Sequence, residues 1–215
     1  MGTIRALAIL LAAAIPAAQD KSALEAPKVD EKAGTVSFSA KSCKTDVYKE
    51  TRGYVEFAIT LPKGKSYESL FEAPVDPVKL HEGLQKIGAK PGKPAADEKT
   101  PATGGKLKIS VRWKDGDKDR SEPIEKFIYD EEAKKTLESV QWIYQGSKEG
   151  FVPQIDGTGL MVLATNNLMG LYQGDGAALI TNPVPIMTGH RYKPNPDLFP
   201  KPGTAVTITM EAVKE

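Results

Sequence analysis

The chain has 215 residues, of which 29 are basic and 28 are acidic, and the two signs are interleaved along most of the sequence. This length allows one domain with a substantial core, and the balanced charge lacks the clustered basic excess of nucleic-acid-binding proteins. Cys43 is the only cysteine, which excludes an intrachain disulfide and an iron–sulfur cluster held by about four thiolates. We therefore expect no cofactor, no metal ion and no nucleic-acid partner.

The N-terminus has the layout of an export signal. Arg5 precedes an apolar run that reaches about Ala14, and small residues follow. The run is shorter than the roughly 20 residues that cross a bilayer. We expect residues 1–18 to be a signal peptide, residues 19–33 a flexible tether and residues 34–215 a single domain. The protein would then be secreted or periplasmic, with no transmembrane span after cleavage.

Alternation of apolar and polar residues predicts strands through most of the domain. The predicted strands are residues 36–40, 54–61, 107–113, 124–129, 140–144, 160–165, 177–181 and 205–212. The sequence Pro62-Lys63-Gly64 predicts a hairpin turn after the second of them, and Asp115-Gly116 predicts another hairpin before residues 124–129.

One segment, residues 77–87, predicts a helix. Asp76 can cap its first turn, Pro77 suits the first helical position, and Gly88 can adopt the left-handed conformation that ends a helix. The apolar residues of this segment share one face, namely Leu80, Leu84 and Ile87. That face should pack against the sheet.

Two long loops rich in proline and glycine interrupt the pattern, at residues 89–105 and 182–203. The second loop contains six prolines together with apolar residues, so we expect it to pack down on the domain without joining a central strand. The fold class that follows is α+β: β-rich and mostly antiparallel, with one helix packed on the sheet.

Several segments together resemble the YdjY-domain family. They are GKSYESLFEAPVDPVKLHEGLQKIGAKPG at residues 64–92, VRWKD at 111–115, WIYQGS at 142–147, ALITN at 178–182 and PGTAVT at 202–207. The resemblance implies an exported cell-envelope protein and an architecture, but no reaction. Tyr67 stands where relatives often carry histidine, so no role for that imidazole can be carried over to this chain.

The loop at residues 182–203 is the candidate site. If it lies near the segment from Trp142 to Ser147, it forms a shallow groove with His190, Arg191 and Tyr192, a mixture suited to a carboxylate or a peptide terminus. Our first hypothesis is therefore a non-enzymatic domain that binds an envelope protein, a peptide or a small molecule. The alternative for this loop is that it only covers a sheet edge.

The alternative function is a hydrolase that uses Ser147 or Ser69 with His81 or His190. It requires a serine hydroxyl and an imidazole within hydrogen-bond reach. A third hypothesis concerns Cys43, which is either a buried small residue or, because a lysine lies on each side, a reactive thiol.

Overall fold

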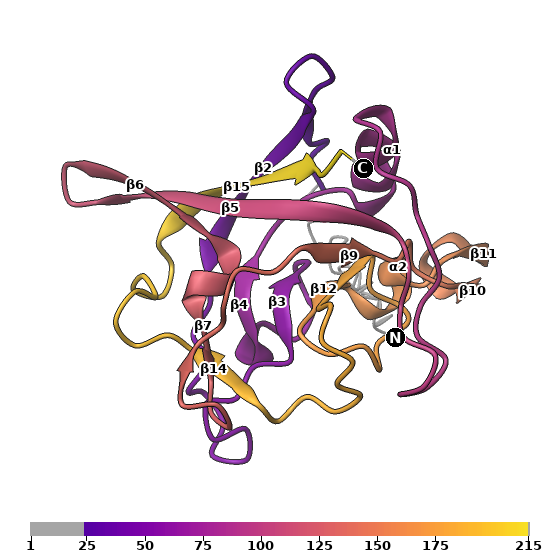
Figure 1. The fold of residues 1–215 in the computed structure, drawn as a ribbon. Helices are drawn as coiled ribbons and strands as arrows, with labels where there is room; N and C mark the ends of the chain where they lie inside the picture. Colours follow the sequence, from indigo (N-terminus) through magenta and orange to yellow (C-terminus); the bar gives the residue numbers. More distant parts are fainter. Residues whose placement is uncertain (1–23, 215) are drawn as a thin grey trace, which may run out of the picture.

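Eight strands of the computed structural model, which describes residues 24–214, close into a β-barrel (Figure 1). In order around the barrel they are β2 (Thr35–Ser42), β15 (Ala205–Ala212), β5 (Gly105–Asp115), β9 (Trp142–Tyr144), β13 (Ile180–Thr181), β12 (Asn167–Gly170), β3 (Phe57–Thr60) and β4 (Ser69–Glu72). Closure comes from the pairing of β4 with β2, in which Lys41 lies opposite Glu72. The β-rich fold with one main helix is as predicted, but the expected sheet is corrected to a closed barrel.

Two of the eight neighbouring strand pairs are parallel, β12 with β13 and β3 with β4, and the others are antiparallel. The hairpin predicted at Pro62-Lys63-Gly64 is therefore wrong. A turn does form there, since the Gly64 N–H donates to the Leu61 carbonyl. The chain then enters a 3₁₀ helix, η1 (Ser66–Glu68), which returns it to the beginning of β3.

The alternating residues of three neighbouring strands form a large part of the core. The inward side chains are Val36, Phe38 and Ala40 of β2, Val206, Ile208 and Met210 of β15, and Leu107, Ile109, Val111 and Trp113 of β5. Directly opposite residues of paired strands point to the same face. The polar residues between them consequently share the outer face of the barrel.

The main helix, α1 (Pro77–Lys86), forms as the sequence predicts. The Asp76 carboxylate accepts hydrogen bonds from the Val78 and Lys79 N–H groups at 2.9 and 3.1 Å. Gly88 has a φ of +91°, a value that favours glycine. Leu80 and Leu84 are fully buried in the core cluster, so the helix packs the predicted face on the barrel.

Two further strands extend the barrel sheet. β1 (Lys28–Asp30) pairs with β2, so the domain begins before residue 34, inside the predicted tether; the predicted signal peptide lies outside the described residues. β6 (Lys118–Pro123) pairs with β5 in a hairpin that projects from the barrel (Figure 1).

Two predicted strands contain helical turns instead. Residues 124–127 form the 3₁₀ helix η2 (Ile124–Phe127), because a three-residue period places both apolar side chains on its buried face. Residues 162–165 form α2 (Val162–Thr165), which ends at Asn166 in the left-handed conformation. The return strand of the predicted hairpin is β6, which precedes residue 124.

Two small sheets lie beside the barrel. One consists of β10 (Glu149–Val152) and β11 (Gly157–Leu160), which the 3₁₀ helix η3 (Pro153–Ile155) connects. The other consists of β14 (Tyr192–Pro194), β7 (Ile128–Asp130) and β8 (Lys135–Thr136). β14 belongs to the loop at residues 182–203, whose Ile186, Leu198 and Phe199 pack against the core. The loop is therefore packed down, as predicted.

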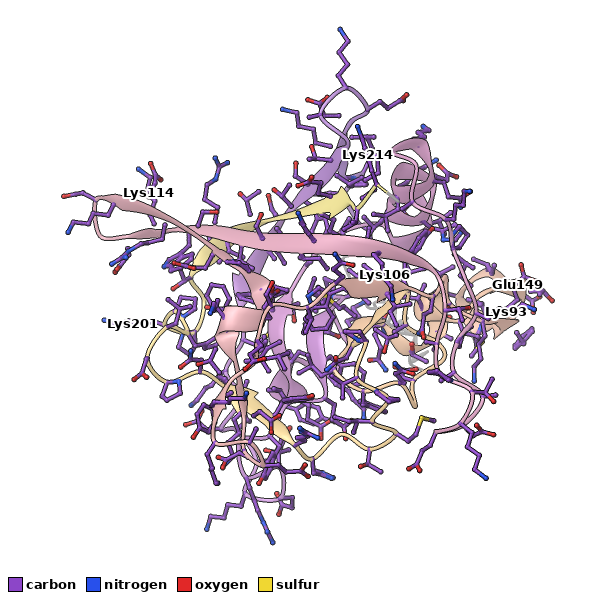
Figure 2. All side chains as sticks on the ribbon, in the orientation of Figure 1. Lys93, Lys106, Lys114, Glu149, Lys201 and Lys214 are labelled. Atoms are coloured by element: carbon purple, nitrogen blue, oxygen red, sulfur yellow. The ribbon has the colours of Figure 1, made fainter. Side chains whose placement is uncertain are left out.

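Charged side chains surround the molecule in the view of Figure 2, and Lys114 marks the projecting end of the β5–β6 hairpin. Among residues 24–214, no helix has both the length and the apolar character that a membrane crossing requires.

Leu84→Ala should lower the free energy of unfolding by about 2–5 kcal/mol, because it leaves a cavity between α1 and the barrel. Lys79→Ala, on the exposed side of the same helix, should cost no more than about 0.5 kcal/mol. Urea denaturation of both variants measures the difference. Equal and small losses would show that the buried face has been assigned wrongly.

Candidate functional site

Three side chains of the predicted groove are buried within the protein. Trp142 and Tyr192 are at most 1% exposed, and Ser147 is 7% exposed. The Tyr192 hydroxyl accepts a hydrogen bond from Asn182 Nδ2 at 3.2 Å, and burial raises its pKa. Among the described residues, no hydrogen bond or ring contact joins residues 190–192 to Trp142 or Ser147.

The other two predicted residues differ in environment. The Arg191 guanidinium forms a two-pronged ion pair with Asp130, whose closest contact is 2.7 Å between Nη2 and Oδ2. Burial alone would raise the pKa of Asp130, but Arg191 and two backbone N–H groups hold it below its usual value. His190 is exposed and meets the Tyr54 ring edge to face. Arg191 therefore joins β14 to the end of β7.

The serines proposed for a hydrolase are engaged with the backbone. Ser147 Oγ donates to the Ala177 carbonyl at 2.6 Å, and Ser69 Oγ donates to the Lys65 carbonyl at 2.7 Å. His81 Nδ1 instead lies 2.7 Å from the Tyr144 hydroxyl, and burial lowers the pKa of its ring. No histidine–serine hydrogen bond exists among the described residues, so the geometry that a hydrolase requires is not assembled.

Arg191→Ala should destabilise the protein by about 3 kcal/mol, because the Asp130 carboxylate, only 6% exposed, keeps two backbone donors but loses its cation. His190→Ala should change stability by less than about 0.5 kcal/mol. Thermal and urea unfolding of both variants at neutral pH measure these effects.

The same ion pair predicts a pH dependence. A carboxyl whose pKa is lowered by folding stabilises the native state above its unfolded pKa, about 3.9, and loses that contribution as the pH falls through the folded value. The wild type should therefore lose more stability than Arg191→Ala upon acidification below pH 4. Parallel losses in the two proteins would contradict this assignment of Asp130.

Cys43 is a buried residue, which agrees with the first of its two interpretations. Burial raises the pKa of its thiol to about 12; Glu72 adds to this effect, and Lys41 opposes it. The reactive thiol would require a lowered pKa.

Alkylation of Cys43 by iodoacetamide at pH 8 should be at least about a hundredfold slower in the native protein than in urea, because little thiolate forms and the sulfur is covered. Every incorporated label reports this residue, and Cys43→Ala gives the background in mass spectrometry. Equal rates in the two states would show an accessible thiolate.

A cleft of about 560 Å³ opens on the outer face of the barrel. We call it the Glu125 cleft, and it is lined by residues 108–110 of β5, 121–123 of β6, Glu125, residues 139–141, and Thr209 and Glu211 of β15. Its origin is a break in the pairing of β5. Residues 105–107 of this strand pair with β9 and residues 110–115 pair with β6, so the intervening edge has neither partner.

Glu125 is the distinctive residue of this cleft. It lies in η2 and is only 4% exposed. Trp142 Nε1 donates to its Oε2 at a long 3.4 Å, and its Oε1 accepts no hydrogen bond from the described residues. A buried carboxylate normally requires a cation or several donors. The carboxylate of Glu125 therefore retains capacity for a donor that enters the cleft.

The charges of the cleft favour a cation. Its lining includes the carboxylates of Glu122, Glu125 and Glu211 but only one ammonium group, that of Lys108. None of these four groups forms an ion pair with a described residue. The uncharged polar groups are the hydroxyls of Ser110, Ser121, Ser139 and Thr209 and the amide of Gln141. A positively charged ligand with several hydroxyl or amide groups is complementary to this lining.

A second large cavity, of about 610 Å³, has a different character. It lies beside the C-terminal end of α1, and its charged residues are Lys90, Lys106 and Lys214. A helix C-terminus carries partial negative charge, which opposes an anion there. None of the buried polar residues lines this cavity, so the Glu125 cleft is the better candidate site.

Sequence reasoning identified Trp142 but missed Glu125. The alternation that predicts a strand at residues 124–129 gives no reason to single out a glutamate there. One signal was present: Ile124 and Phe127 follow Pro123 at a three-residue spacing, which favours a 3₁₀ turn and would have placed Glu125 beside buried residues.

Comparison with known proteins identifies the family of this chain. The model of the YdjY domain matches residues 28–211, which is most of the chain. No curated protein and no solved structure matches.

Proposed function

Because this chain belongs to the YdjY-domain family, whose description specifies no reaction, we propose a function from the geometry of the chain itself. The protein is a non-enzymatic domain that binds a small polar ligand through the ammonium group of that ligand. The observation that carries the proposal is the carboxylate of Glu125, which is buried, lines an open cleft and has one indole N–H as its hydrogen-bond donor. An ammonium group that donates to Oε1 would supply the missing partner.

The size and lining of the cleft support a small molecule. Ligand sites commonly enclose about 300–1,000 Å³ and combine apolar walls with a few polar groups. Here Pro123 and Val140 offer apolar contact, while the hydroxyls and Gln141 offer donors and acceptors. The three carboxylates would repel an anionic ligand, which separates this proposal from the carboxylate that we expected at residues 190–192.

Trp142 is a positioning residue for the carboxyl group of Glu125. Its ring is fully buried, and its only polar atom holds Glu125 Oε2. That contact engages Oε2 and leaves Oε1 for the ligand. The indole is thus a support for the site and does not itself touch the ligand.

The setting that we propose is the cell envelope. Residues 1–18 carry the pattern of an export signal, and a domain outside the cytoplasm would meet amine-bearing wall components, peptides and small metabolites. A binding role requires no catalytic group, and the serine hydroxyls considered for a hydrolase are occupied by backbone carbonyls.

Isothermal titration calorimetry with two amine probes, glucosamine and triglycinamide, tests the proposal. At least one should bind, and Glu125→Gln should weaken that binding about tenfold or more, because a neutral amide loses the charge-assisted hydrogen bond. Glu149→Gln, on the projecting β10 strand, is the matched control and should leave affinity unchanged.

Thermal unfolding of Glu125→Gln checks that the variant is folded, and its amide oxygen can still accept from Trp142. Binding that is the same in wild type and Glu125→Gln would overturn the proposal. So would the failure of both amines to bind at millimolar concentration.

A further inference from the structure

The outer face of β2, β15 and β5 carries hydroxyl side chains in register. Thr209 of β15 lies directly opposite Ser37 of β2 on one side and Ser110 of β5 on the other. Thr207 likewise lies opposite Ser39. Since opposite residues of paired strands share a face, these five side chains form two adjacent hydroxyl rows.

These hydroxyls have no partners within the protein. None of the five forms a side-chain hydrogen bond with a described residue, whereas the buried hydroxyls of Ser42, Ser69 and Ser147 each donate to a backbone carbonyl. A free hydroxyl can both donate and accept. The rows therefore offer a regular set of donors and acceptors to a ligand that is itself rich in hydroxyl groups.

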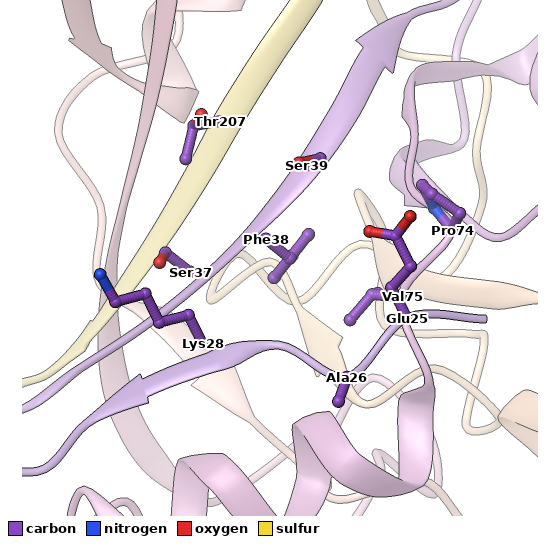
Figure 3. Close-up of a pocket in the computed structure, with 9 residues that line it drawn as sticks. All are labelled: Glu25, Ala26, Lys28, Ser37, Phe38, Ser39, Pro74, Val75 and Thr207. Atoms are coloured by element: carbon purple, nitrogen blue, oxygen red, sulfur yellow. The ribbon is translucent and has the colours of Figure 1, made fainter.

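The rows connect two cavities. Ser110 and Thr209 belong to the Glu125 cleft. Ser37, Ser39 and Thr207 line a smaller cavity of about 250 Å³, which we call the β2 cavity and which Glu25 and Lys28 also line (Figure 3). Neighbouring strands are about 4.8 Å apart, so the path from β5 across β15 to β2 spans about 10 Å. A ligand longer than one sugar ring could occupy the cleft and the rows together.

We propose that the Glu125 cleft and the hydroxyl rows form one extended site for an oligosaccharide with a free amino group. This proposal rests on the proposed function, because the amino group of the oligosaccharide donates a hydrogen bond to Glu125. The next sugar crosses Ser110, Thr209 and Ser37, and the oligosaccharide continues toward the β2 cavity. The hydroxyls of a sugar can donate to and accept from the serine and threonine hydroxyls of this polar face, and a hydroxyl-rich ligand offers more such partners than a peptide of the same length.

Calorimetry with glucosamine and with its disaccharide and tetrasaccharide tests the extension. The disaccharide should bind at least about tenfold more tightly than the monosaccharide, and the N-acetylated tetrasaccharide should bind at least tenfold more weakly than the free-amine form. In the double variant Ser37→Ala/Ser39→Ala, whose residues lie outside the Glu125 cleft, the disaccharide should bind no more tightly than glucosamine, whose own affinity should be unchanged. Thr158→Val, an exposed strand threonine on β11, is the matched control.

The outcomes separate the two proposals. If glucosamine binds in a Glu125-dependent way but affinity does not rise with chain length, the extended site is overturned while the proposed function stands. A rise with length that the double variant leaves intact also overturns it. A gain with length for oligoglycine amides that equals the gain for the sugars would assign the surface to peptides and overturn the oligosaccharide.

Discussion

The pairing of β4 with β2 closes the sheet into a barrel. Lys41 lies opposite Glu72 there, their side chains form a 2.8 Å ion pair, and the Cys43 N–H continues the contact by donating to the Leu70 carbonyl. A closed sheet leaves only short unpaired edges, such as residues 108–109 of β5, and must place alternate side chains inside and outside. Closure therefore sets both the apolar core and the polar outer face that contains the Glu125 cleft.

The cleft follows from a local mismatch within this ring. β5 is longer than β9, so its two ends are paired by different strands, and the chain between β6 and β9 must leave the sheet and return. The η2 turn in that excursion buries Ile124 and Phe127 and takes Glu125 with them. A carboxylate placed in this way is costly unless a donor reaches it. The cleft and the carboxyl group with a single donor thus arise from the same connection.

Local signals in the sequence predicted the elements that depend on local physics. Asp76, Pro77 and Gly88 defined the helix, and alternation defined β2, β5 and β15. Barrel closure was not predictable, because the contact of Lys41 with Glu72 joins strands whose order no short pattern encodes. The groove at residues 190–192 was inferred from composition, but Arg191 is engaged by Asp130, far away in sequence. Glu125 was missed because its importance comes from burial and from the indole of Trp142.

The two tryptophan side chains of the protein make ligand binding at Glu125 directly observable in a ¹H–¹⁵N NMR titration with glucosamine. Trp142 Nε1–H donates to Glu125. Trp113 of β5 packs against Phe127 of η2 and makes no hydrogen bond to that carboxylate. If the ligand binds Glu125, the indole resonance of Trp142 should shift progressively and saturate, while that of Trp113 stays in place. A Trp142 resonance that does not move, or equal shifts of both indoles, would contradict a ligand held by Glu125.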